Sequence, residues 1–230
     1  MAGRGTKGAR QDDASRREDA DSTNPSGDTR QRVVEAAIQC ILEQGFYRAS
    51  SNAIAERAGL TWGVIQYYFG TREKLMLTVL QEGSNRLAED LRNAEIVGTT
   101  LTERVEQLFD ILDVYYGSPD YLAFIQVLVN LGHDPRTSEQ TRQTMAEINE
   151  QANPELNRLL AGVFAGTGIR RRDIRNVLFH ALRGLSLSHV MLTTTEPHAY
   201  TTSRQQSLAE RRLLARALSL LIEQESTSAG

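Results

Sequence analysis

The chain has 230 residues, of which 40% are apolar and 24% charged, and its formal net charge is −3. This length supports one large core or two modest ones, and the acidic balance excludes a uniformly basic nucleic-acid-binding surface. The single Cys40 excludes a disulfide framework and a thiolate metal site, and its apolar neighbours predict a packed thiol. No apolar run approaches the roughly 18 residues of a membrane span, and no apolar signal region follows Met1. We therefore expect a soluble, cytoplasmic protein without a membrane contact.

Residues 1–27 contain almost no large apolar side chain, so they are expected to form a disordered tail. Their basic residues could touch DNA phosphates, but interspersed acidic residues favour a solvated tail. Helical periodicity begins at Asp28, where Asp28 and Gln31 resemble a capping box, and Gly45 is placed to end the helix.

Two very short helices are predicted next, at 51–58 and 62–69, and a longer helix capped by Thr71 runs to about residue 96. The short helices are too small to be stable alone, so each must pack on the first helix. Three helices joined by such turns form a helix-turn-helix core, whose second short helix enters the major groove of DNA.

A helical wheel through 62–69 turns three apolar residues inward: Ile65, Tyr68 and Phe69. Gly63, Gln66 and Tyr67 point the other way, and Trp62 and Val64 lie on the flanks. This exterior suits a helix pressed against DNA, because Gly63 allows close approach, Gln66 can bond an adenine edge and Tyr67 can donate to a phosphate.

Residues 49–75 read ASSNAIAERAGLTWGVIQYYFGTREKL, and this stretch resembles the DNA-binding segment of the tetracycline-repressor (TetR) family. The matching features are the Ile-Ala-x-x-Ala-Gly helix and turn, the Thr-x-Gly start of the next helix, its Tyr-Phe end and the following Thr-Arg-Glu-x-Leu. The resemblance covers about 45 residues, whereas the rest of the chain matches only in length and helical pattern.

The resemblance implies that Ser50 caps the second helix and bonds a phosphate, that Asn52 reaches the DNA and that Arg72 meets the DNA backbone. It also places Thr61 at the cap of the recognition helix and Gly63 at the point of close approach. Trp62 and Gln66 depart from the small polar or basic residue and the Tyr that are common there, so the target sequence does not follow by analogy. The predicted DNA-binding residues are Arg48, Ser50, Ser51, Asn52, Thr61, Trp62, Gly63, Val64, Gln66, Tyr67, Arg72 and Lys74.

The remaining sequence predicts helices at about 101–116, 119–131, 136–165, 170–193 and 203–224, without strand alternation. We therefore expect an all-α protein of about nine helices, with a helix-turn-helix DNA-binding domain at 28–75 and a ligand-binding and dimerisation domain at 76–230. Residues 30–75 contain six basic and four acidic side chains, so one module alone would bind DNA weakly. A symmetric dimer, with recognition helices about 34 Å apart on a near-palindromic site, would double the contacts.

The last two helices are apolar on most of their circumference, which requires burial on both sides. A second copy of the chain is the expected partner, and an internal helix pair within a monomer is the alternative. The predicted interface residues are Leu178, Leu182, Leu185, His189, Leu213, Leu214, Ala217 and Leu221.

The middle helices supply a candidate cavity for an apolar or amphipathic small-molecule effector. Its predicted lining residues are Leu108, Phe109, Leu112, Tyr116, Phe124, Leu128, Met145, Ile148, Asn149 and His180. For any single one of them, ordinary core packing is the competing interpretation. No catalytic residue, metal site or cofactor is predicted, because His133-Asp134 lacks a partner nucleophile and His180 and His189 lie too far apart on one helix to share a metal.

These patterns predict a DNA-binding regulator, in the form of a repressor released from its operator by the effector. A ligand-independent architectural or activating DNA-binding protein is the first alternative. An all-α enzyme with a structural N-terminal module is the second.

Overall fold

The computed structural model describes residues 25–167, 172–195 and 204–228, with side chains described over 26–167, 176–188 and 207–224. Every regular element in these ranges is an α-helix, which confirms the all-α prediction. The helices are α1 Pro25–Gln44, α2 Ser51–Arg57, α3 Trp62–Phe69, α4 Arg72–Asn93, α5 Leu101–Tyr116, α6 Pro119–His133, α7 Glu139–Glu150, α8 Asn153–Val163, α9 Arg172–Thr195 and α10 Arg204–Ser228.

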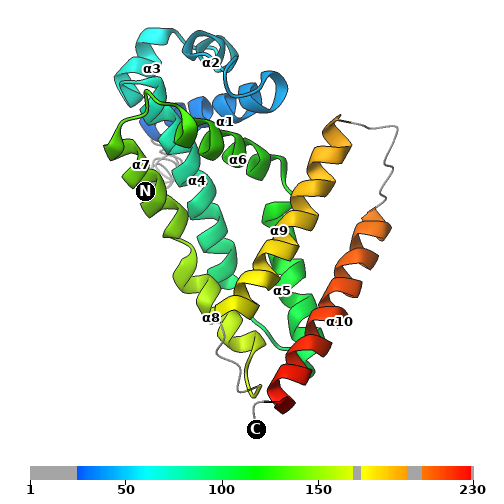
Figure 1. Cartoon of the computed structure of the whole chain (residues 1–230). Helices are drawn as coiled ribbons and strands as arrows, with labels where there is room; N and C mark the ends of the chain where they lie inside the picture. The colour runs from blue at the N-terminus through cyan, green and yellow to red at the C-terminus, as the bar shows by residue number, and fades with distance from the viewer. Residues whose placement is uncertain (1–24, 168–171, 196–203, 229–230) are drawn as a thin grey trace, which may run out of the picture.

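Helices α1 to α3 cluster at one end of the molecule, and α4 runs from this cluster into the body (Figure 1). α4 is continuous over 22 residues, so it passes through the domain boundary that we predicted between residues 75 and 76. The body and the N-terminal cluster therefore share one continuous helix. α6 adds a second link, because it packs on both α1 and α4.

Hydroxyl side chains define the starts of several helices. Each accepts a hydrogen bond from the backbone N–H three residues ahead, as N-caps do: Ser50 for α2, Thr71 for α4, Thr100 for α5, Ser118 for α6 and Ser138 for α7. At α5 the cap is reciprocal, since the Glu103 carboxylate accepts from the Thr100 N–H at 3.0 Å.

The predicted start of the first helix was wrong. α1 begins at Pro25, so Asp28 lies in its first turn rather than before it, and the Gln31 amide donates to Glu35 at 3.0 Å. Residues 25–27 of the predicted tail are therefore helical, and residues 1–24 lie outside the described part of the chain.

The single helix that we predicted over 136–165 is two helices, α7 and α8, separated at Gln151 and Ala152. Pro154 stands at the start of α8. Proline has no N–H to donate to a carbonyl one turn earlier, and its ring clashes with that carbonyl, so a continuous helix is disfavoured here. The break gives α8 a direction of its own.

The main core lies where α4, α5, α6 and α8 meet, and fully buried side chains such as Leu108, Phe109 and Leu112 fill it. Each buried residue of this size contributes about 1.5–3 kcal/mol relative to exposure. α9 and α10 form an antiparallel pair that packs on α5 (Figure 1). No described helix has the length together with the apolarity that a transmembrane span requires.

Candidate functional site

The α1–α3 cluster is a helix-turn-helix module with its own apolar centre. Ile41, Ile54 and Ile65 are fully buried there, one from each helix. Each helix of the module is followed within two residues by a glycine with positive φ, and Gly59, at +66°, occupies a backbone region that other residues rarely adopt. Arg32 on α1 donates to the Ala58 carbonyl at 2.8 Å and so ties the α2–α3 turn to α1.

The outward face of α3 matches the predicted helical wheel. Tyr67 is 84% exposed, and Gly63 and Gln66 are exposed beside it. A side-chain carbon built on Gly63 would meet nothing closer than the Thr61 hydroxyl at 3.8 Å, so the space above this glycine is open. A flat, polar-edged partner can therefore approach the backbone at Gly63.

The start of α3 differs in detail from the expectation. Thr61 occupies the N-cap position, but its hydroxyl makes no capping hydrogen bond. Trp62 is half-buried and packs against the core of the module, which favours scaffold cover over contact with a DNA sugar. Val64 is also half-buried on the flank.

The polar residues around α2 fall into two groups. Ser50 and Asn52 are exposed, and Ser51 is half-buried at the start of the helix. The Ser50 hydroxyl accepts from the Ala53 N–H at 3.2 Å, which confirms its capping position. Its predicted bond to a phosphate, and the reach of Asn52, remain predictions.

The basic residues of the module have different surroundings. Arg48, which precedes α3 in the chain, and Lys74, which follows it, are both exposed. Each adds a positive charge to the surface of the module. Arg72 is half-buried instead, donates to the carbonyls of Ala49 and Phe46, and lies 4.4 Å from the centre of the Phe46 ring. Burial lowers the pKa of the Arg72 guanidinium. Arg72 therefore braces the α1–α2 loop, and its contact with the DNA backbone stays a prediction.

Two cavities open among helices α4 to α9. The inner cavity, of about 60 Å³, includes four predicted residues in its lining: Tyr116, Phe124, Leu128 and Asn149. The outer cavity, of about 260 Å³, includes His180. Asn149 and His180 are exposed, so they lie at the rims rather than inside as buried orienting groups.

The other predicted cavity residues line neither cavity, because they are buried in the main core: Leu108, Phe109, Leu112, Met145 and Ile148. Sequence reasoning missed Tyr115, Tyr121 and Arg183, which do line the inner cavity. Burial raises the pKa of the Tyr115 and Tyr121 hydroxyls, in the case of Tyr121 to about 12. The sequence signal that could have indicated this cavity is the group of three tyrosines within seven residues, at 115–121.

The predicted dimer interface divides into buried and exposed residues. Leu178 and Leu182 are fully buried within their own chain, where α9 packs on α5 and α10, so they are removed from the interface. Leu213 and Leu221 are 64% and 58% exposed, and Ala217 is exposed between them. Leu185 and Leu214 are half-buried at the edges, and the side chain of His189 lies outside the described residues.

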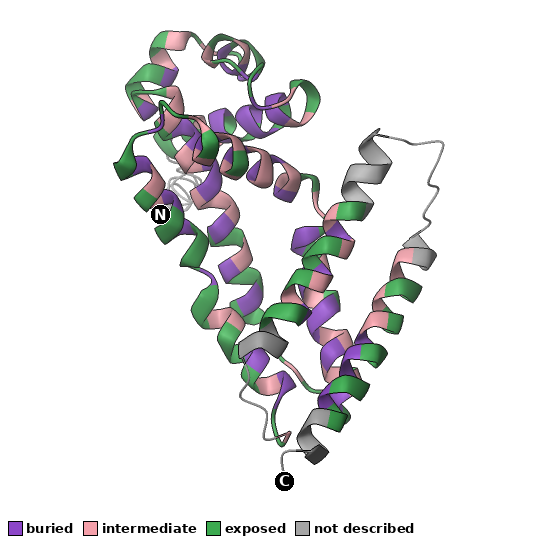
Figure 2. Cartoon of the chain, in the orientation of Figure 1, coloured by how far each residue is buried: buried purple, intermediate pink, exposed green. Residues whose placement is uncertain are grey.

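An exposed apolar face therefore runs along α10, and Leu220, 61% exposed, belongs to it. In Figure 2 the buried residues of α10 lie toward α5 and exposed ones cover the other side. A half-buried ion pair between Arg211 and Asp113 fixes this orientation, and Ser186 on α9 donates to the same Asp113 carboxylate at 3.0 Å.

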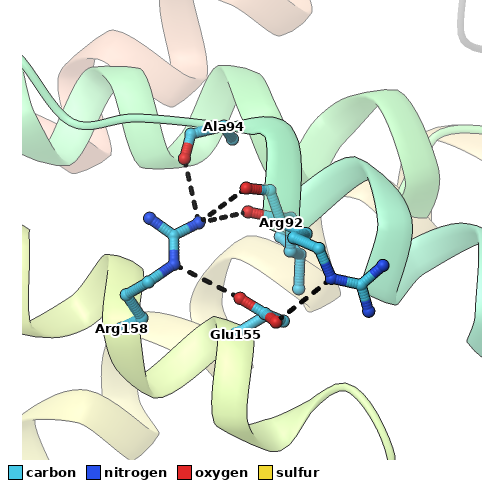
Figure 3. Close-up of polar contacts among 5 residues, drawn as sticks. Arg92, Ala94, Glu155 and Arg158 are labelled. Carbon is cyan, nitrogen blue, oxygen red and sulfur yellow. Dashed lines mark hydrogen bonds and ion pairs between the residues drawn. The ribbon is translucent and has the colours of Figure 1, made fainter.

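The C-terminal end of α4 is held by α8 (Figure 3). Nη2 of Arg158 lies 2.6 Å from the Leu91 carbonyl oxygen, 3.2 Å from that of Arg92 and 3.0 Å from that of Ala94. Glu155 joins Arg158 and Arg92, with N–O distances of 3.2 and 3.4 Å. Because Asn153 and Leu156 of the same helix line both cavities, α8 connects the cavities to α4.

Comparison with known proteins agrees with this architecture. Residues 33–79 match the family described as bacterial regulatory proteins, tetR family. The HTH-type transcriptional repressor AcnR of Corynebacterium efficiens is 33% identical over 69 residues, which are 30% of this chain and 37% of that repressor, so the match spans only about a third of the relative's length.

Two solved structures share the fold over most of their length. A transcriptional regulator from Rhodococcus sp. Rha1 has a TM-score of 0.63 at 17% identity, with 82% of this chain and 95% of that chain covered. The regulator FadR from Bacillus subtilis, in complex with stearoyl-CoA, has a TM-score of 0.53 at 20% identity, with 84% and 96% covered. The helix-turn-helix segment at 33–79 is therefore similar to that of the tetR family of bacterial regulatory proteins, and the all-α fold is shared with both solved structures.

Proposed function

We propose that the protein is a homodimeric transcriptional repressor that binds a near-palindromic DNA operator through α3 and leaves it when a small amphipathic molecule occupies the cavities. The carrying observation is the outward face of α3, where an open glycine, an exposed Gln66 and an 84% exposed Tyr67 stand on a rigid module. Such a face offers close approach, a base-edge contact and a phosphate contact together.

The repressor mode and the small-molecule response are inferred from two further features. AcnR, which shares the module, is a repressor, and the B. subtilis FadR was crystallised with an acyl-coenzyme A. In this chain, α8 contributes to the cavities and also holds the end of α4. Binding rather than catalysis is the activity that these features support.

Dimerisation is proposed through the apolar face of α10, defined by Leu213, Ala217, Leu220 and Leu221. An exposed leucine row of this kind is costly in water and is covered in a four-helix contact between two copies. The double variant Leu220→Glu, Leu221→Glu is expected to be monomeric in light scattering. Arg212→Glu, an equal change of charge on the flank of α10, should remain dimeric.

The DNA-binding proposal is tested by mobility shift on double-stranded DNA selected from a random library by the purified protein. The wild type is expected to bind its selected site with a Kd of about 10⁻⁸ M or lower at physiological salt. Tyr67→Ala should weaken binding at least about tenfold, since it removes a contact at the centre of the interface. Val97→Ala, an exposed residue beyond the far end of α4, is the control and should not change binding. Equal affinities of the wild type and Tyr67→Ala would contradict the placement of α3 in the groove.

A further inference from the structure

The two cavities adjoin and differ in chemistry. They share Asn153, Leu156 and Arg183 in their linings, so they meet at the α8–α9 side. Beyond this border the inner cavity is surrounded mainly by aromatic and aliphatic side chains, and the outer cavity mainly by polar ones. A molecule that spans the border would need a compact apolar body and a polar end.

Arg183 is the one charged side chain in the lining of the inner cavity. Its guanidinium donates to the Tyr116 hydroxyl at 3.3 Å and lies 5.2 Å from the centre of that ring. No carboxylate among the described side chains pairs with it. Within the described part of the chain, Tyr116 is the partner of this positive charge, and the rest of the Arg183 side chain is exposed to solvent.

Tyr121 supplies an unsatisfied hydrogen-bonding group on the inner cavity. It is 2% exposed, and its hydroxyl has no hydrogen-bond partner among the described residues. Burial raises the pKa of this hydroxyl to about 12, so it keeps its proton at neutral pH and can donate. Buried donors are nearly always paired, and an unpaired one calls for an acceptor.

Arg183 and Tyr121 can serve the same bound group, because both contact Tyr116. The ring centres of Tyr116 and Tyr121 are 4.9 Å apart, and the Arg183 guanidinium lies over the Tyr116 ring. We propose that the cavities bind a compact organic monocarboxylate, with its carboxylate accepting hydrogen bonds from Arg183 and Tyr121 and its apolar body among Phe124, Leu128 and the tyrosines. A neutral apolar ligand would leave the Tyr121 hydroxyl unpaired and the Arg183 charge without a carboxylate, and a cation would be repelled by Arg183.

This inference names the effector class of the proposed regulator, and its binding can be measured without DNA. Benzoate, benzamide and benzylamine are matched probes that carry a negative, a neutral and a positive group on one ring. Calorimetric titration of the full-length wild type is expected to show benzoate binding at least about tenfold tighter than benzamide, because charge-assisted hydrogen bonds are the stronger ones. Benzylamine should bind more weakly than benzamide.

Three variants assign the preference to its residues. Arg183→Gln should bring the benzoate-to-benzamide ratio close to one, and Arg183→Lys, which keeps the charge, should retain a preference for benzoate. Tyr121→Phe should weaken benzoate binding several-fold and keep the preference. Arg136→Gln, on an exposed turn, is the control and should match the wild type.

The proposal is overturned by equal binding of benzoate and benzamide, by a preference that survives in Arg183→Gln, or by no benzoate binding up to about 10 mM. A benzoate preference in a protein that binds no DNA would refute the repressor function and leave this inference standing. Conversely, an intact operator complex without any benzoate binding would refute this inference alone.

Discussion

Replacement of Arg158 by methionine tests how firmly α8 holds the end of α4. Methionine keeps an apolar stem of similar length and removes the guanidinium that reaches the carbonyls of Leu91, Arg92 and Ala94. Nη2 carries two hydrogens, so two of the three bonds can be well formed at one time. A hydrogen bond to a charged group contributes about 1.5–3 kcal/mol when buried.

The expected magnitude follows from the exposure of this side chain. Arg158 is 46% exposed, so solvent replaces part of each lost bond, and we expect Arg158→Met to lower the free energy of unfolding by about 2 kcal/mol. The assay is urea denaturation at one fixed protein concentration, because dimerisation makes stability depend on concentration. The slope of the free energy with urea should not change.

A matched control separates the carbonyl bonds from the ion pairs. Glu155→Gln removes the charge between Arg158 and Arg92 and leaves the three carbonyl bonds intact. Its cost should stay below about 0.5 kcal/mol, as for other surface ion pairs. If Arg158→Met costs no more than Glu155→Gln, the reasoning that Arg158 holds α4 through its carbonyls is refuted.

Three further predictions concern stability and reactivity. Glu103 accepts backbone hydrogen bonds at the start of α5, which lower its pKa from 4.5 to about 2. The stability that these bonds contribute is present above pH 4.5 and is lost as the pH falls toward 2. In urea titrations, Glu103→Gln should therefore lose less stability than the wild type between about pH 5 and pH 3. Gly83→Ala should lower the free energy of unfolding by about 1 kcal/mol in the same assay, because the added side-chain carbon would lie 2.9 Å from the Phe124 ring. Gly132→Ala, whose added carbon would have its nearest neighbour at 3.7 Å, should raise the free energy of unfolding by about 0.5 kcal/mol. The reverse order would contradict the close packing of α4 on α6. Cys40 is fully buried, and burial raises the pKa of its thiol, so it should react with a thiol reagent only on unfolding; rapid labelling of the native protein would contradict this.

The helix-turn-helix module was the part that sequence predicted best, since its information is local. Glycines at positive φ and an N-cap hydroxyl end and start its helices, and eight residues suffice to show which face of α3 is apolar. For Arg72 the sequence predicted a DNA contact, which stays a prediction, and only the fold shows that its guanidinium also donates to the Phe46 and Ala49 carbonyls.

The body was less predictable because its contacts join residues far apart in the chain. An apolar stripe on α9 does not reveal whether its own chain or a second copy covers it, and Leu178 and Leu182 proved to be internal. Arg183 was overlooked for a similar reason. On the sequence it is one charge on an apolar helix, and only the packing of α9 against α5 brings it to Tyr116, 67 residues away.

The hydrogen bonds from Arg158 to the end of α4 also affect how a small movement near the cavities is transmitted to α3 in the proposed repressor. α4 has 22 residues, which corresponds to a rigid rod of about 33 Å, with α3 at one end and Arg158 at the other. A tilt of about 5° around either end displaces the opposite end by about 3 Å, the length of one hydrogen bond. Such a tilt of α4 around its Arg158 end therefore moves the α3 end far enough to break a hydrogen bond to a base edge. Communication between the cavities and the DNA can then proceed by rotation of one intact helix, without unfolding any part of the module.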